Sequence, residues 1–409
     1  MNLIKPEFEK AVKIYLDEMF FSSSGIISSE KKSLLNTSLP FVNLIRQNVS
    51  DDFQHSFPLF ATWHLTSSCN LRCIHCYYND TEYKDKNELS VIQAQSLVND
   101  LVQNLGIIKI ILTGGEPFLR PDIMDIIETL KKNNVSVFIQ TNGLLINDEQ
   151  IKRLGEIFSP YLDVVQISLD ASTEGTFEKI RKSKYFFALL DTIRKLVSNN
   201  IKVSINCTVN NLNINEVSNL YDICREIGAM DFAVSRLQAY NDMHREIEPD
   251  DESLMLLAAE LLCKEKKYQN AGTFLALNLF SIFDLVNNPM IEKILSLPKY
   301  KQRIEEMSVP NYCSCNHNDR LNIQSDGRVY MCMEAICDSG YLGDVKSESV
   351  SEIWKKRKKC ELYKERLYKN LKCKDCDYKK LCKGGCVGRA FVKYGDINMP
   401  DSKCKLVQL

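Results

Sequence analysis

Apolar and polar residues follow two different periods along this chain, and the change of period divides it into regions. Near the start, apolar side chains recur at the i, i+3, i+4, i+7 spacing of one helix face. They are Phe8, Ala11, Val12, Tyr15, Leu16, Met19 and Phe20. The run Ser22-Ser23-Ser24-Gly25 would end this helix. The pattern predicts a short helical N-terminal extension over residues 1–57.

From residue 58 onward, short strand-like runs alternate with helical segments. The expected strands are Phe60–Thr66, Ile107–Thr113, Val135–Gln140, Leu162–Leu169, Ile201–Val209 and Asp231–Ser235. The clearest helix opens with Ser90 and Gln93, which form a capping box. Six strands separated by helices predict a parallel α/β architecture, which right-handed crossovers would curl into an open or closed barrel. Catalytic groups then belong at the carboxyl ends of the strands.

The remaining chain changes character twice, which predicts further boundaries. Residues 58–265 form the expected α/β core, 266–309 a mostly helical linker and 310–409 a cysteine-rich domain. Between Trp354 and Lys383 there are thirteen Lys or Arg and four Asp or Glu, a local charge of +9. We interpret these lysines as a solvated helical surface near anionic metal centres, not as a nucleic-acid face.

Composition narrows the class of protein. The 409 residues are 44% hydrophobic and 26% charged, which suits a folded chain, and the net charge of −1 gives no general attraction to nucleic acid or membrane. The charge-free, largely apolar run 271–283 is shorter than the roughly 20 residues of a membrane span. No secretory signal is evident at the start, so we expect a cytoplasmic protein. Sixteen cysteines in a reducing compartment indicate metal ligands, not disulfides.

The first cysteine cluster comes directly after the first expected strand. Cys69, Cys73 and Cys76 are separated by three and two residues. Three thiolates are one ligand short of a closed structural zinc site, whereas on a four-iron cluster they would leave one iron open. The alternative is a zinc site completed by His64 or His75.

This cluster resembles the Cys-x3-Cys-x-aromatic-Cys loop of the radical SAM superfamily, with His75 in the aromatic position. Three further elements follow successive strands in the family's order: Gly114-Gly115-Glu116-Pro117, then Thr141-Asn142-Gly143, then Ser168 and Asp170. Each alone reads as an ordinary turn or cap. Their order and spacing favour the resemblance, which implies a partial (β/α)6 TIM-like barrel.

The resemblance also implies a chemistry. A [4Fe-4S] cluster on the three catalytic cysteines would bind S-adenosyl-L-methionine and cleave it reductively to a 5′-deoxyadenosyl radical, which abstracts hydrogen from substrate. Gly114, Gly115 and Glu116 would hold the methionyl amino end, and Ser168 and Asp170 the ribose. Arg181 would bind the carboxylate, although Lys182 stands where relatives have glycine. His75, Thr141 and Asn142 complete the expected cofactor-binding set.

The C-terminal cysteines resemble a SPASM domain with two auxiliary [4Fe-4S] clusters, which brings the expected total to three. One block is Cys315-x11-Gly327-x4-Cys332; the other is Cys373-x2-Cys376-x5-Cys382-x3-Cys386-x17-Cys404. By resemblance, Cys313, Cys315, Cys332 and Cys386 would hold the first auxiliary cluster and Cys373, Cys376, Cys382 and Cys404 the second. Cys337 is an alternative to Cys313. A zinc ribbon would need only four of these residues.

The resemblance implies an oxidoreductase that modifies or crosslinks a peptide or protein in ribosomal peptide maturation. Its expected partners are a peptide encoded by a neighbouring gene and a reductase such as flavodoxin or ferredoxin, without nucleic acid or membrane. One alternative is a sulfatase maturase, which has an Asp after the cysteine matching Cys332, where this chain has Met333 and then Glu334. Others are a small-molecule enzyme of haem or cofactor synthesis and, from another class, a zinc-binding scaffold.

Overall fold

One sheet of ten strands organises the chain. The computed structural model describes residues 6–17, 60–76, 87–239, 241–268, 273–279, 291, 294–298, 320–333, 336–357, 374–376, 384–402 and 404. The strands are β1 (Phe60–His64), β2 (Lys109–Thr113), β3 (Ser136–Thr141), β4 (Val164–Ser168), β5 (Val203–Val209), β6 (Asp231–Arg236), β7 (Phe274–Asn278), β8 (Arg320–Ile323), β9 (Arg328–Tyr330) and β10 (Tyr341–Asp344). Their spatial order is β10-β9-β8-β1-β2-β3-β4-β5-β6-β7, and all neighbours from β8 to β7 are parallel.

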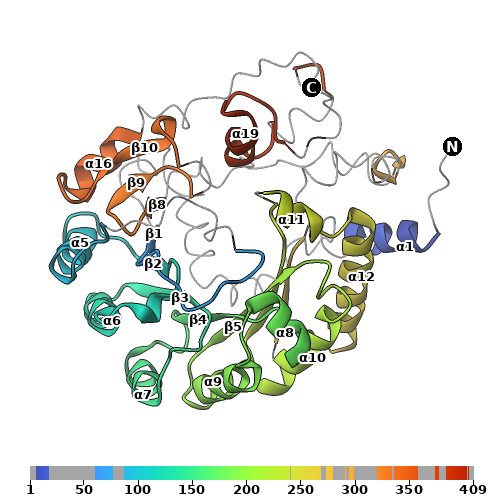
Figure 1. Ribbon diagram of the computed structural model, residues 1–409, viewed down its shortest axis with the longest axis horizontal. Coiled ribbons are helices and arrows are strands. Elements are labelled where there is room, and N and C mark those ends of the chain that lie inside the picture. Colours follow the sequence, from blue (N-terminus) through green and yellow to red (C-terminus); the bar gives the residue numbers. More distant parts are fainter. Residues whose placement is uncertain are drawn as a thin grey trace.

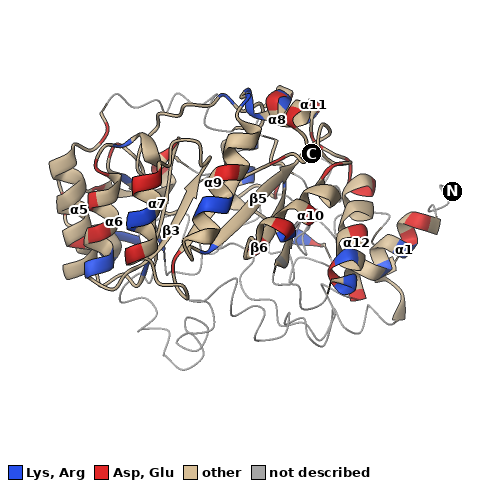
Figure 2. Ribbon diagram, turned by 90° about the horizontal axis from the view of Figure 1, so that it is seen from below, with Lys and Arg blue, Asp and Glu red and all other residues tan. Residues whose placement is uncertain are grey.

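Helices cover the outer face of this curved sheet (Figure 1). On that face lie α5 (Val91–Gln103), α6 (Ile123–Lys132), α7 (Asp148–Ile157), α9 (Phe186–Ser198), α10 (Val217–Ile227), α12 (Asp251–Lys267) and α16 (Val350–Lys356). The other described helices are α1 (Pro6–Tyr15), which packs against α12, and α8 (Glu174–Arg181), α11 (Asp242–Glu246) and α19 (Val387–Tyr394). Lys and Arg are interspersed with Asp and Glu on their solvent sides (Figure 2). The result is the mixed α/β fold with a TIM-like parallel core that the sequence predicts.

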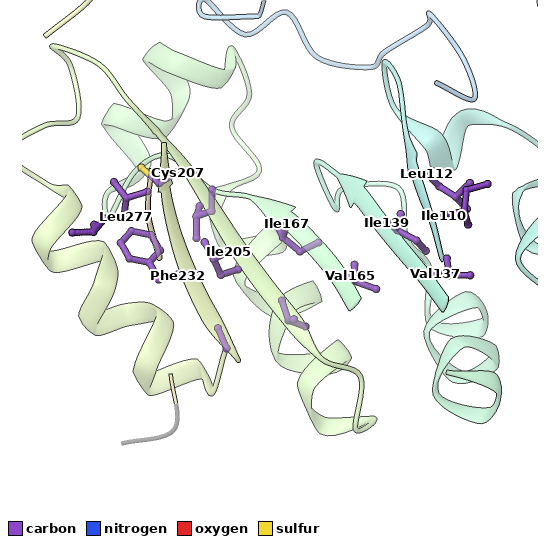
Figure 3. Close-up of a cluster of buried hydrophobic side chains, with 14 of the residues drawn as sticks. Ile110, Leu112, Val137, Ile139, Val165, Ile167, Ile205, Cys207, Phe232 and Leu277 are labelled. Carbon is purple, nitrogen blue, oxygen red and sulfur yellow. The ribbon is translucent and has the colours of Figure 1, made fainter. Parts of the chain in front are cut away.

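The apolar core lies between the sheet and these helices, because alternate strand residues point to opposite faces. Figure 3 shows the helix-facing set, which includes Ile110, Ile139, Ile167, Ile205 and Phe232, all fully buried. The opposite, inner face carries many polar side chains. Parallel strands covered on both faces are usually apolar throughout, so this inner face is unusual.

The six predicted strands are all present, with ends shifted by at most a few residues. The predicted capping box is confirmed: the Ser90 hydroxyl accepts from Gln93 N, and the Gln93 side chain accepts from Ser90 N. One strand was not predicted. The region 266–309, expected to be helical, contributes β7, which pairs in parallel with β6. Its sequence Phe-Leu-Ala-Leu-Asn is short and apolar, and such runs do not distinguish strand from helix.

The predicted N-terminal helix is confirmed as α1 where the structure describes it. Phe8, Ala11, Val12 and Tyr15 are buried, and α1 packs against α12. The other predicted members of that face, Met19 and Phe20, lie outside the described residues, as does the remainder of the extension to residue 57.

The C-terminal region continues the core sheet. Strand β8 pairs in parallel with β1, so that Phe60 lies opposite Arg320 and Trp63 opposite Ile323. Strands β9 and β10 then extend the sheet as antiparallel neighbours. Within the described part of the chain, no helix is both long and apolar enough to cross a membrane.

Candidate functional site

The loop that carries Cys69, Cys73 and Cys76, here called the cysteine loop (residues 65–76), leaves the carboxyl end of β1 and crosses the turn after β2. Three backbone hydrogen bonds join the two segments. Leu65 N donates to Thr113 O at 2.8 Å, Gly115 N to Thr66 O at 2.7 Å and Glu116 N to Ser68 O at 2.8 Å. The cysteine loop is therefore built onto the Gly114-Gly115-Glu116 turn.

The two glycines are required by this close approach. A Cβ atom on Gly114 would lie 2.4 Å from Thr66 O, and one on Gly115 would lie 2.0 Å from Ser68 O. Gly114 also has a φ of +136°, which side chains rarely adopt. Their expected role toward the methionyl amino end stays a prediction, but the fold itself requires glycine at both positions.

Glu116 is completely buried and joins the turn after β2 to the turn after β3. Its Oε1 accepts from Thr141 Oγ1 at 2.6 Å and from Phe118 N at 3.1 Å, and its Oε2 accepts from Asn142 N at 2.8 Å. Burial raises the pKa of this carboxyl, and the three donors oppose the rise. Both oxygens are thus engaged within the protein, where we expected a partner for the methionyl amine.

Asn142 carries the contact one step further, to the first cysteine. Its side-chain amide donates to Asn70 Oδ1 at 2.8 Å and lies 3.9 Å from Cys69 Sγ. Its Oδ1 accepts from Leu144 N at 3.0 Å, which fixes the turn. Asn70 was not among the predicted site residues, because nothing local marks an Asn that follows a cysteine.

The three cysteines lie in one polar environment. Cys73 is buried, and Cys69 and Cys76 are half-buried. Burial raises the pKa of Cys69, the Leu71 amide at 3.4 Å from its sulfur lowers it, and nearby Glu116, Cys73 and Cys76 raise it further. A cationic metal centre would offset this rise at Cys69, because it stabilises the thiolate form of a cysteine ligand.

Asp170, Arg181 and His75 form an ionic group beside Cys73. Arg181 Nη2 lies 2.5 Å from Asp170 Oδ2, and Arg181 Nη1 donates to Cys73 Sγ at 3.6 Å. His75 Nε2 lies 3.5 Å from the same Asp170 oxygen. The structure therefore brings together two residues expected at opposite ends of the cofactor, Asp170 for the ribose and Arg181 for the carboxylate.

Burial controls the charges in this group. It opposes the charged form of Arg181, but Asp170 and the Cys73 sulfur raise the pKa of the guanidinium above its ordinary value. Burial lowers the pKa of His75 to about 4 despite the attraction of Asp170, so the imidazole is neutral near pH 7. Arg181 is thus the permanent cation beside Cys73.

The same group has polar atoms without hydrogen-bond partners, and these show whether a cofactor could fit here. His75 Nδ1 and Arg181 Nε are buried, and no described residue supplies them with a hydrogen-bond partner. Buried polar atoms without a partner are uncommon and often mark a ligand site. Together with three neighbouring thiols, they fit a cluster that binds a polar organic cofactor.

The described residues hold no preformed group of ligands for a single metal ion, and this is equally true of the three cysteines. Within the described residues, no three His, Cys, Asp or Glu side chains converge as ligands of one metal ion. His64 is buried beneath the cysteine loop at the end of β1, and burial lowers its pKa to about 4. Neither His64 nor His75 completes a zinc site with the cysteines.

Sequence reasoning missed a row of polar side chains on the inner face of the sheet. Gln140 Nε2 donates to Gln166 Oε1 at 2.9 Å, and Gln166 Nε2 donates to Ser204 Oγ at 3.3 Å. Ser204 in turn donates to Asp231, whose pKa burial raises to about 7. The alternation Val-Ser-Ile-Asn-Cys-Thr-Val of β5 carried this signal, because it places every polar residue on one face. Ser168, predicted to bind ribose, points to this inner face at the end of β4.

The C-terminal cysteines are described in part. Cys332, Cys337, Cys376, Cys386 and Cys404 are among the described residues; Cys313, Cys315, Cys373 and Cys382 are outside them, as is Glu334. Asp401 joins Cys386 to Cys404: its Oδ2 accepts from Cys386 N at 2.7 Å, and its carbonyl accepts from Cys404 N at 3.0 Å. The two cysteines assigned by resemblance to different clusters therefore share one anchor. The choice between Cys313 and Cys337 stays open.

Comparison with protein families finds two matches. The radical SAM superfamily matches residues 63–224, and the SPASM iron-sulfur cluster-binding domain matches residues 313–377. The first match contains the cysteine loop and the turns after β2, β3 and β4. The second begins at Cys313 and ends just after Cys376.

Similar proteins include enzymes with different substrates. The AdoMet-dependent heme synthase of Methanosarcina barkeri is 26% identical over 359 residues, which cover 85% of this chain and 96% of that protein. Mycofactocin maturase MftC of Mycobacterium ulcerans is 25% identical over 361 residues, 87% of this chain and 90% of that one. The structure of Streptococcus suis SuiB bound to precursor peptide SuiA aligns with a TM-score of 0.69 at 16% identity, over 98% of this chain and 94% of SuiB, and shows the shared fold.

Proposed function

This chain belongs to the radical SAM superfamily and carries a C-terminal SPASM domain, and from that premise we propose that it oxidatively modifies a peptide or protein side chain. It is an enzyme that uses iron-sulfur clusters and S-adenosylmethionine. The peptide substrate, the type of product and the number of clusters are the parts that we propose.

The residues around Cys73 suit the first cluster and its cofactor. Cys69, Cys73 and Cys76 would supply three thiolates, and the open iron would take the amino and carboxylate groups of S-adenosylmethionine. With the cluster and S-adenosylmethionine both bound, the site would supply a 5′-deoxyadenosyl radical for hydrogen abstraction from the substrate. Arg181 places a permanent positive charge beside an anionic centre, and such charges stabilise it. His75 Nδ1 and Arg181 Nε are the buried atoms free to bind the cofactor.

The observation that carries the peptide proposal is the polar inner face of the sheet. Gln140 and Gln166 are half-buried there, and amide groups of this kind pair well with the amides of a peptide. Ser204 is buried behind them, where it accepts from Gln166. Similarity to mycofactocin maturase over 87% of the chain supports the same class. Hydrogen abstraction from a peptide carbon leaves a substrate radical, and loss of one more electron and a proton gives an oxidised product.

Two auxiliary clusters in the C-terminal region would accept that electron, which brings the proposed total to three. The three clusters together correspond to roughly twelve iron and twelve sulfide per chain, since such centres are cysteine-bound four-iron cubanes. A flavodoxin or ferredoxin would supply the electron that starts each turnover.

A second candidate is a tetrapyrrole oxidation. The relative named heme synthase is matched over 96% of its length, more than the maturase. A tetrapyrrole is a large planar substrate that needs apolar walls, whereas the inner face here is rich in amides and hydroxyls. We therefore rank the tetrapyrrole second.

The deciding experiment is anaerobic incubation with S-adenosylmethionine, a strong reductant and either peptides encoded beside this gene or a coproporphyrin, followed by mass spectrometry. We expect a peptide product lighter by two hydrogens per event, with 5′-deoxyadenosine formed in proportion. Oxidation of the coproporphyrin alone would favour the second candidate. The control is the Cys69→Ala/Cys73→Ala/Cys76→Ala variant, which should form no 5′-deoxyadenosine while keeping iron in the C-terminal region.

The role of the auxiliary clusters has its own test. A Cys373→Ala/Cys376→Ala variant should make no oxidised product but retain some uncoupled cleavage of S-adenosylmethionine, because the first cluster stays whole. A folded variant that makes full product would instead assign these clusters a structural role.

A further inference from the structure

We propose that residues 87–89, here called the strut, hold the cysteine loop in its binding geometry and are themselves held by the C-terminal region, with Glu88 as the positioning residue. The inference goes beyond the proposed function, since it concerns the loop and not the substrate. The proposal rests on one observation. The strut forms hydrogen bonds with the cysteine loop on one side and with the SPASM domain on the other.

Glu88 fixes the cysteine loop where it leaves β1. Its Oε1 accepts from Thr66 Oγ1 at 2.9 Å, from Ser67 N at 2.7 Å and from Ser67 Oγ at 2.8 Å. A carboxylate bound by a backbone amide and two hydroxyls is a strong anchor, because charged hydrogen bonds are about twice as strong as neutral ones. The anchored residues lie two and three positions before Cys69, so they set the direction in which the cysteines continue.

The C-terminal region holds the other side of the strut. Leu89 N donates to Ser325 O at 2.8 Å, and Lys346 Nζ donates to Asn87 O at 2.7 Å. Ser325 lies in the turn between β8 and β9, and Lys346 follows β10. Both contacts therefore come from the three strands that extend the sheet beyond β1.

Gly327, the glycine of the Cys315-x11-Gly-x4-Cys332 motif, completes this contact. It has a φ of +93°, and a Cβ atom there would lie 3.0 Å from Leu89 Cδ2 and 3.1 Å from Asp344 Oδ1. The Leu89 side chain is 2% exposed. The absence of a side chain at Gly327 thus makes room for Leu89 of the strut, a role that requires no metal ligand nearby.

Arg120 locks the strut to the core. It is buried, and its Nη1 donates to Leu65 O at 3.2 Å, in the cysteine loop, and to Leu89 O at 3.0 Å, in the strut. Its Nε and Nη2 donate to the two oxygens of Asp122 at 2.9 and 2.7 Å, which compensates the buried charge. Loop, strut and the turn after β2 consequently move as one unit.

The test measures the first cluster, not turnover. In the full-length reconstituted protein, we would record the change that S-adenosylmethionine produces in the electron paramagnetic resonance signal of the reduced cluster, and the rate at which a chelator removes that signal. Direct partners of metal ligands typically contribute 10- to 100-fold to metal affinity. Glu88 acts through Thr66 and Ser67, so we take the lower end of that range and expect Glu88→Ala to lose the signal about tenfold faster. Glu88→Gln should partly rescue it, because its amide oxygen still accepts.

Variants on the far side of the strut separate positioning from simple local damage. Lys346→Met and Gly327→Ala touch no cysteine, yet each should accelerate loss of the same signal. Lys195→Met is the lysine control, because Lys195 lies on the surface of α9, where its described ion-pair partners are Asp148 and Asp191. Glu216→Gln is the carboxylate control: it also anchors a loop, through Ser172 N and the hydroxyls of Thr173 and Thr176, but that loop carries no cysteine.

The possible results discriminate clearly. If Glu88→Ala and Glu88→Gln, with unchanged melting temperatures, keep the wild-type signal and rate, Glu88 does not position the loop. The alternative result is that the Glu88 variants lose the signal faster, while Lys346→Met loses it at the rate of Lys195→Met and Gly327→Ala at the wild-type rate. The C-terminal region then does not hold the strut. Either result overturns the proposal, and neither depends on which substrate the enzyme takes.

Discussion

The turns after β1, β2 and β3 form hydrogen bonds with one another's polar groups. The ionic group of Asp170, Arg181 and His75, by contrast, has buried polar atoms without a described hydrogen-bond partner. In the first region, Glu116 uses both oxygens on Thr141, Phe118 and Asn142. In the second, His75 Nδ1 and Arg181 Nε have no hydrogen-bond partner among the described residues. We therefore regard the Glu116 region as a scaffold, and the region of His75 and Arg181 as the surface that can still form hydrogen bonds with a ligand.

The first test of this contrast is Glu116→Ala, which removes the carboxylate that joins the turns of the scaffold. Three buried donors would lose their acceptor, and each unsatisfied buried group costs about 1–3 kcal/mol, so we expect roughly 3–5 kcal/mol less stability. Chemical denaturation followed by circular dichroism measures it. Glu156→Ala, on the exposed side of α7, is the control and should change stability little.

A double-mutant cycle sharpens the same point. Thr141→Val removes one donor of the Glu116 contact, so combined with Glu116→Ala it should cost less than the sum of the two single changes. Fully additive effects would mean that Glu116 and Thr141 act separately, and the scaffold would not be a single unit.

The second test uses the inner-face row, where burial raises the pKa of Asp231 to about 7 from an ordinary value of 3.8. The folded state then holds a proton that the unfolded chain releases, so stability is full below pH 3.8 and declines as the pH rises toward 7. The decline is at most about 4 kcal/mol, since one pKa unit corresponds to about 1.4 kcal/mol.

Asp231→Asn removes this titration and should flatten the dependence of unfolding free energy on pH between about 4 and 7. Denaturant curves at several pH values for both proteins provide the comparison. If the unfolding free energies of the two proteins changed with pH in parallel, Asp231 would have an ordinary pKa, and its burial on the inner face would not oppose its ionisation.

The smallest effect concerns Lys182, which ends α8 in the left-handed conformation with a φ of 55°. A residue with a side chain is strained there by about 1 kcal/mol, whereas glycine is not. Lys182→Gly should therefore stabilise the protein by up to about 1 kcal/mol, measured as a rise in melting temperature. Asn200→Gly is the matched control: Asn200 has a φ of 59° but tolerates it better, so the gain should be smaller.

Much of this fold was predictable because its signals are local. The period-two strands, the Ser90 capping box and the polar residues at successive strand ends all lie within short stretches of sequence. These signals placed Glu116, Thr141 and Asn142 at one edge of the sheet, and the structure brings them together there.

The rest depends on contacts between distant residues, which leave no local pattern. The role of Glu116 toward the cofactor stays a prediction, and nothing local showed that its carboxylate also joins Thr141 and Asn142, which are 25 and 26 residues away. Glu88 and Arg120 gave no signal, because a single charged residue in a loop resembles any solvated one. Strand β8 pairs with β1 across more than 250 residues, and β7 is too short to differ from a helical fragment.

The pairing of β8 with β1 also determines how this protein can avoid self-association. All five residues of β1 are buried, and Trp63 is among the largest fully buried side chains. Without β8, β1 would become an open edge with unpaired N–H and C=O groups along an apolar strand, the type of surface that templates pairing between molecules. The C-terminal strands therefore cover what would otherwise be an exposed apolar edge of the core sheet.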